Sequence, residues 1–82
     1  MTHRILLFAG VRAASGLDHI ELDIQDGDTA KTVLEKLAER LPESAGLIRI
    51  SRLASNGAYV NDGDSVGGRR GELALIPPVS GG

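Results

Sequence analysis

The sequence has no cysteine and no tryptophan, and it holds a single phenylalanine and a single tyrosine. Without cysteine, a disulfide, a thiolate metal site and a cysteine nucleophile are all excluded. With so few aromatic side chains, the core has to be built from leucine, isoleucine, valine and alanine. A chain of 82 residues is long enough for one domain with a small core.

An excess of one charge sign is also missing. The formal net charge is −2; residues 1–41 carry five basic and seven acidic side chains, and residues 42–82 carry four of each. A nucleic-acid-binding face needs a basic surface, so no nucleic-acid partner is expected. The two histidines, His3 and His19, predict no metal site, and we expect both on the surface of strands.

No apolar run approaches the roughly 18 residues of a membrane-spanning helix. The N-terminus also lacks the apolar segment of a secretory signal. We therefore expect a soluble, cytoplasmic protein with no membrane partner.

Two strands are expected near the N-terminus. The run RILLFAGV (Arg4–Val11) is apolar almost throughout, which predicts a strand buried on both faces. HIELDI (His19–Ile24) alternates apolar and charged residues, which predicts a half-buried strand. Because the turn residues of AASGLD separate the two runs, an antiparallel hairpin is expected.

The clearest periodic signal is TAKTVLEKLAERL, residues 29–41, which predicts an amphipathic helix. Asp28 or Thr29 is expected to cap its first turn, and Pro42 is expected to end it. The predicted buried face comprises Val33, Leu34, Leu37, Ala38 and Leu41.

The second half of the chain is expected to contain further strands. Residues 42–50 are ambiguous, and the interpretation is a short turn of helix followed by a strand. Asn56-Gly57 lies between two strand-like pieces and predicts a hairpin. The last strand is expected within ELALIPP, where Pro77 and Pro78 stop it because proline donates no ladder hydrogen bond.

This order of elements predicts an α+β fold: a mixed sheet of four to five strands with one main helix across one face. The strongly apolar first and last strands are the natural central pair. A hairpin, a crossing helix and a returning central strand make a β-grasp, or ubiquitin-like, roll. We expect residues 1–78 to form this domain and residues 79–82 to form a flexible Gly-Gly tail.

Two segments that suggest ligand sites have simpler explanations. VGGRRG (66–71) lacks the Gly-Lys-Ser/Thr of a phosphate loop and precedes a strand rather than a helix, so a flexible loop is expected. The acidic residues Asp23, Asp26 and Asp28 lack the ligand spacing of a calcium loop, and turns and helix capping account for them. The sequence therefore predicts no metal site and no bound cofactor.

The C-terminal segment PPVSGG is the part of the sequence that suggests a chemical function. Six residues from Pro77 can extend about 20 Å, far enough to enter a cleft in another protein. Glycine has no Cβ, so a terminal carboxylate on Gly81-Gly82 can pass a narrow opening. A carboxylate is a poor electrophile and needs activation, for example as an acyl-adenylate. In a chain without cysteine, the C-terminus is the most plausible covalent handle.

Four pieces of sequence carry a family resemblance: ILLFAGVR, TVLEKLAER, ASNGAYV and, above all, ELALIPPVSGG. In these the chain resembles the small subunits of molybdopterin synthase, which are ubiquitin-like sulfur carriers. The resemblance runs along nearly the full length. Two departures concern the loop before the last strand, which reads GRRGE where the family commonly has Asp-Gly-Asp, and Ser55, where the family usually has an apolar residue.

The resemblance implies that Gly82 is adenylated by an activating enzyme that uses ATP and is then converted to a thiocarboxylate. Gly81 would allow close passage, and the arm inserted into the large subunit would comprise Pro77, Pro78, Val79 and Ser80. Two such sulfurs convert cyclic pyranopterin monophosphate to molybdopterin in a heterotetramer of two small and two large subunits. The small subunit is not a catalyst by itself.

Phe8 and Ile76 would lie where the family uses apolar residues against its partners. If their strands are adjacent, both side chains can share one exposed face of the sheet. The alternative for Phe8 is a place in the core, where phenylalanine is most often found.

Three other functions remain open at this stage. The chain can be a sulfur carrier of another pathway, of the thiamine thiazole type. It can be a ubiquitin-like modifier that is conjugated to lysines. It can also be a non-covalent interaction module with an inert tail.

Overall fold

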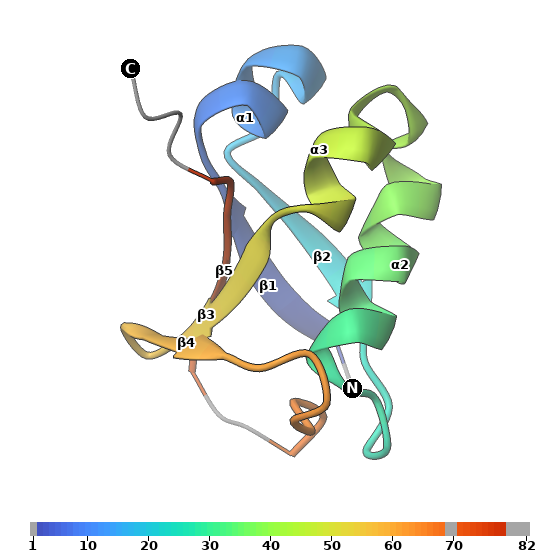
Figure 1. The fold of residues 1–82 in the computed structure, drawn as a ribbon, viewed down its shortest axis with the longest axis vertical. Coiled ribbons are helices and arrows are strands. Elements are labelled where there is room, and N and C mark those ends of the chain that lie inside the picture. Colours follow the sequence, from blue (N-terminus) through green and yellow to red (C-terminus); the bar gives the residue numbers. More distant parts are fainter. Residues whose placement is uncertain (1, 69–70, 79–82) are drawn as a thin grey trace.

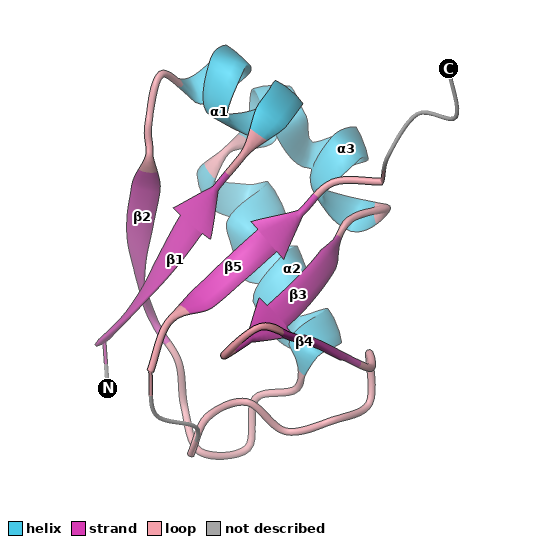
Figure 2. Cartoon of the chain, turned by 90° about the vertical axis from the view of Figure 1, so that its left-hand side faces the viewer, coloured by secondary structure: helices cyan, strands magenta, loops and turns pink. Residues whose placement is uncertain are grey.

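Five strands form one mixed sheet, and the helices lie against one of its faces (Figures 1 and 2). The computed structural model describes residues 2–68 and 71–78. The elements are β1 (Thr2–Leu7), α1 (Ala9–Ser15), β2 (His19–Asp23), α2 (Ala30–Arg40), the 3₁₀ turn η1 (Pro42–Ser44), α3 (Ala45–Arg49), β3 (Arg52–Ser55), β4 (Ala58–Val60) and β5 (Leu73–Ile76). The expected α+β, β-grasp architecture is confirmed.

The sheet order is β2-β1-β5-β3-β4, so the first and last strands are neighbours, as predicted. β1 and β5 are parallel, with Ile5 opposite Leu73 and Leu7 opposite Leu75. All other pairs are antiparallel. The last strand of the sequence thus lies in the middle of the sheet, with a partner on each side.

The expectation for Arg4–Val11 was wrong in two respects. β1 ends at Leu7 and is buried on one side only, since its residues alternate between exposed and buried positions. At Ala9 the backbone turns into the left-handed region, with φ 49°, and the helix α1 begins there. The connection to β2 is therefore a helix and not a tight hairpin loop, although the two strands are antiparallel as expected.

The helix α1 is short and has weak sequence signals. Its N-cap, Phe8, makes no side-chain capping bond, and Val11 is its one buried residue. Gly16 ends it in the left-handed conformation, with φ 74°. A Cβ on Gly10 would come within 2.9 Å of Leu47 Cδ2, so α1 packs closely against α3.

His3 is buried and not on the surface. Its exposed fraction is 7%, because the alternation of β1 places it on the inner side together with Ile5 and Leu7. His19, at the start of β2, is half-buried.

The helix α2 crosses the inner face of the sheet and closes the core. Thr29 caps it by accepting a hydrogen bond from the Thr32 amide at 3.3 Å. Two further amides of the first turn donate to carbonyls of the loop after β4: Ala30 to Asp64 at 3.0 Å and Lys31 to Asp62 at 3.1 Å. The predicted buried face is confirmed, with Val33, Leu34, Leu37 and Ala38 in the core and Leu41 packed against it.

Of the ambiguous residues 42–50, residues 42–49 are helical and Ile50 ends the helix. Pro42 begins the 3₁₀ turn η1 directly after α2, and α3 follows with Ile48 buried. The chain leaves α3 at Ser51, whose Oγ donates to the Leu47 carbonyl at 2.7 Å. The strand that the sequence allowed here begins only at Arg52.

The Asn56-Gly57 hairpin is confirmed. Both residues have positive φ, 51° and 85°, as the tight turn between two twisted strands requires.

The loop from residue 61 then returns under the N-terminus of α2. There Gly67 lies so close to the chain that a Cβ would come within 2.0 Å of the Gln25 carbonyl oxygen.

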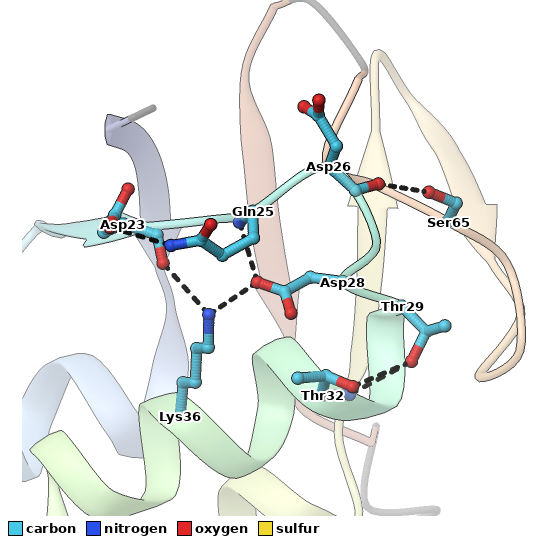
Figure 3. Close-up of polar contacts among 8 residues, drawn as sticks. All are labelled: Asp23, Gln25, Asp26, Asp28, Thr29, Thr32, Lys36 and Ser65. Carbon is cyan, nitrogen blue, oxygen red and sulfur yellow. Dashed lines mark hydrogen bonds and ion pairs between the residues drawn. The ribbon is translucent and has the colours of Figure 1, made fainter.

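Asp28 does not cap α2 but joins α2 to the loop after β2 (Figure 3). Its carboxylate accepts hydrogen bonds from the Gln25 amide at 2.8 Å and from Lys36 Nζ at 2.5 Å. Lys36 also donates to the Asp23 carbonyl at 3.2 Å. The hydrogen bond from Lys36, followed by that from the Gln25 amide, lowers the pKa of Asp28 below its ordinary 3.8.

Leu37→Ala should destabilise the domain by about 2–5 kcal/mol, since Leu37 is fully buried and the substitution leaves a cavity. Urea unfolding measures the loss. The exposed Glu39→Ala on the same helix serves as the control and should change the free energy of unfolding by no more than about 0.5 kcal/mol. Equal effects of the two substitutions would contradict the assigned core face.

Asp28→Asn should lower the melting temperature at neutral pH and lose this effect in acid. The folded pKa of Asp28 is depressed, so its stabilisation is present above the ordinary value of 3.8 and disappears as the pH falls through the folded pKa. Thermal melts across this pH range measure the difference. The matched control is Asp26→Asn, because the Asp26 carboxylate points away from this network (Figure 3).

Candidate docking face and tail exit

The outer face of the sheet has no helix over it (Figure 2). A shallow groove of about 590 Å³ runs along this face. Its lining is mostly apolar and comes from β3, β4 and β5, the turn between β3 and β4, and the residues directly after β1 and before β5. The lining residues are Phe8, Ala54, Asn56, Gly57, Tyr59, Glu72, Ala74 and Ile76.

Phe8 belongs to this outer surface and not to the core. Its exposed fraction is 41%, and it lines the groove together with Ile76. The parallel register explains the pairing: Leu7 lies opposite Leu75, so the next residues of the two strands are brought side by side. The two residues that the sequence placed on one face are therefore brought together. Their role in binding a partner stays a prediction.

The structure adds groove residues that sequence reasoning did not single out. Tyr59 is 59% exposed on β4 and lies opposite Ala54 in the register. Asn56 and Gly57 form the hairpin turn at the rim, and Glu72 precedes β5. The Asn-Gly turn was visible in the sequence, and extending the strand alternation outward from it would have placed Tyr59 on the outer face.

The chain leaves the sheet beside this groove. β5 ends at Ile76, Pro77 is half-buried and Pro78 is exposed. The remaining residues of the predicted arm, Val79, Ser80, Gly81 and Gly82, lie outside the described residues. Their predicted roles, with Gly82 as the activated end, therefore stay predictions.

The two segments that suggested ligand sites in the sequence, the acidic residues 23–28 and the loop 66–71, gain no support as such sites. Residues 2–68 and 71–78 contain no group of three or more histidine or acidic side chains placed to hold a metal ion. In the segment 66–71, Val66 and Gly67 are buried, and residues 69–70 lie outside the described part. Within that part, no helix is long and apolar enough to span a membrane.

The topology and the solved structures that the chain resembles define a ubiquitin-like β-grasp protein. SAMP1 from Haloferax volcanii, a small archaeal modifier protein, superposes with a TM-score of 0.77 at 26% identity, with full coverage of both chains. The ThiS family model matches residues 5–82, and the chain therefore belongs to the ThiS family.

Two curated relatives make the likeness more specific. The molybdopterin synthase sulfur carrier subunit of Dictyostelium discoideum is 38% identical, with 96% of this chain and 94% of the relative aligned. The protein of the same name from Arabidopsis thaliana is 34% identical, with 96% and 81% aligned. The family resemblance read from the sequence is confirmed by these matches.

Phe8→Ala should leave the domain nearly as stable as the wild type. Phe8 loses a half-exposed side chain, while Leu75→Ala, one strand away but fully buried, should cost about 2–5 kcal/mol. Urea unfolding of both variants compares the two faces of the sheet. A loss at Phe8 as large as that at Leu75 would place Phe8 in the core.

Proposed function

We propose that this chain is the sulfur carrier subunit of a molybdopterin synthase. The observation that carries the proposal is the ThiS-family β-grasp domain, with relatives named as this subunit, ending in PPVSGG directly after the central strand β5. The terminal carboxylate of Gly82 is the group that holds the sulfur. The chain needs no side-chain nucleophile for this role, in agreement with the absence of cysteine.

The carboxylate first has to become an electrophile. A carboxylate oxygen of Gly82 attacks the α-phosphate of ATP, which yields an acyl-adenylate and pyrophosphate. Hydrosulfide-level sulfur (HS⁻) from a donor then attacks the carbonyl carbon and forms the C–S bond, while the C–O bond to AMP breaks. The products are AMP and a C-terminal thiocarboxylate, which differs from the carboxylate by one sulfur in place of one oxygen.

Both the activating enzyme and the large subunit have to receive the tail. The groove lined by Phe8, Ile76 and Tyr59 supplies the adjacent contact surface, since an apolar patch on an exposed face is typical of an interface. Pro77 and Pro78 restrict the backbone between groove and tail and so reduce the entropy lost on insertion. The carrier supplies sulfur for cyclic pyranopterin monophosphate, and the large subunit supplies the catalytic site, in a heterotetramer of two copies each.

A second candidate is a ubiquitin-like modifier, which the likeness to SAMP1 favours. Both functions begin with the same acyl-adenylate. In a modifier, a lysine amine attacks the activated carbonyl and an isopeptide bond results. Intact mass spectrometry of the protein from its native host separates the two: a gain of about 16 mass units, from oxygen to sulfur, marks the carrier, and covalent adducts mark the modifier.

Deletion of Gly82 should abolish molybdopterin formation without changing the melting temperature. The residue lies beyond β5 and outside every described element, so the core does not depend on it. A reconstituted assay with activating enzyme, ATP, sulfur donor and large subunit measures activity beside a thermal melt. Full activity of the truncated chain would refute the carrier function, and a collapsed melt would show that the tail is structural.

A further inference from the structure

Arg52 is an exposed cation on the outer face of the sheet, where it lies over the ring of Tyr59. Within residues 2–68 and 71–78, Arg52 forms no ion pair. Its guanidinium carbon lies 4.5 Å from the centre of the Tyr59 ring. Among the described residues, Arg12 pairs with Asp18, Lys36 with Asp28 and Arg49 with Glu35. Like Arg52, the exposed cations Arg4, Lys31 and Arg40 form no ion pair there, but Arg52 alone of these four is held over an aromatic ring.

The register places Arg52 at the tail end of the groove. Arg52 lies opposite Ile76, the last residue of β5, and Pro77 follows at once. The alternation of β3 buries Leu53 and exposes Arg52, which therefore shares the outer face with Ala54. The cation thus stands beside the point at which the chain leaves the sheet.

The opposite end of the groove carries the opposite charge. Glu72 precedes β5 and lines the groove. Ile76 lies four residues further along the chain than Glu72, which is about 13 Å in an extended backbone. The apolar groove is therefore polarised along β5, with a carboxylate at its far end and a guanidinium at the tail exit.

We propose that Arg52 is a specificity-determining residue that pairs with a carboxylate of the partner, at the mouth of the channel that receives the tail. This inference rests on the proposed function and names the chemistry of the large subunit's docking site: an apolar surface with an Asp or Glu at the channel mouth. A guanidinium matches a carboxylate with two parallel hydrogen bonds. Tyr59 holds the guanidinium in place by stacking and so reduces the entropy that the contact costs.

The polarity also sets the direction of docking. A partner turned by 180° along the groove would bring its carboxylate against Glu72, and like charges across an interface are strongly unfavourable. Only one orientation therefore joins unlike charges, and in that orientation the tail meets the channel.

Charge reversal tests the proposal. The probe is the molybdopterin synthase large subunit of the same organism, titrated by calorimetry with the full-length carrier at low and at high salt. Arg52→Glu should raise Kd by at least about tenfold at low salt, and the ratio should shrink at high salt because screening weakens the repulsion. Arg52→Lys keeps the charge but loses the planar fork, so its loss should be smaller.

Arg49→Glu is the matched control. Arg49 is an exposed arginine on α3, away from the groove, and carries the same change of charge. Its Kd should stay within about twofold of the wild type. Thermal melts of all variants ensure that affinities are compared per folded molecule.

Two results would overturn the inference while leaving the proposed function intact. One is an unchanged Kd for Arg52→Glu, and the other is an equal loss for Arg49→Glu, which would mean that only net charge matters. If the wild-type chain neither binds the large subunit nor forms a thiocarboxylate, the proposed function itself fails, and the inference fails with it.

Discussion

The parallel pairing of β1 with β5 is the constraint on which the rest of the molecule depends. Both strands run toward the same edge of the sheet and finish together, with Leu7 opposite Leu75. The residue that leaves β1, Phe8, and the residue that ends β5, Ile76, therefore meet at one place. A different register would separate the apolar groove from the start of the tail, even with every side chain unchanged.

The two faces of the sheet are built for different purposes. The inner face is covered by α2 and α3 and contains an aliphatic core. The loop after β4 secures this layer, since its carbonyls accept hydrogen bonds from the first amides of α2. The side chains of the outer face contribute little to the free energy of unfolding. Their identity can therefore be determined by the partner that they contact.

The sequence was sufficient for the parts of the fold that strong periodicity defines. The α2 face, the alternation of β2, the Asn56-Gly57 turn and the central place of β5 all follow from side-chain spacing and turn chemistry. α1 was missed because an apolar run can be a strand or a buried helix. The deciding event, a left-handed backbone at Ala9, has no glycine to mark it. For the same reason His3 was wrongly expected on the surface. Its side chain points inward because the alternation of β1 places residues 3, 5 and 7 on the buried side.

The candidate site could be predicted where it depends on neighbouring strands, and not where it depends on a contact between two particular side chains. Phe8 and Ile76 followed from the expected pairing of the first and last strands. Arg52 and Tyr59 meet only because β3 and β4 pair in one particular register. Tyr59 lies in the quoted piece ASNGAYV, but no spacing or turn in the sequence indicates that the Arg52 guanidinium lies over its ring, and this contact is known only from the structure.

The place of β5 has a consequence for biosynthesis. Of the five described strands β5 is the last to be synthesised, yet it fills the gap between β1 and β3. Until it emerges, both neighbours present unpaired edges and the aliphatic layer beneath them is open to water. A nascent chain without β5 therefore cannot complete the sheet, and the sheet closes only after this strand has been synthesised. Any enzyme that recognises the outer face thus recognises a chain whose final strand is already in place.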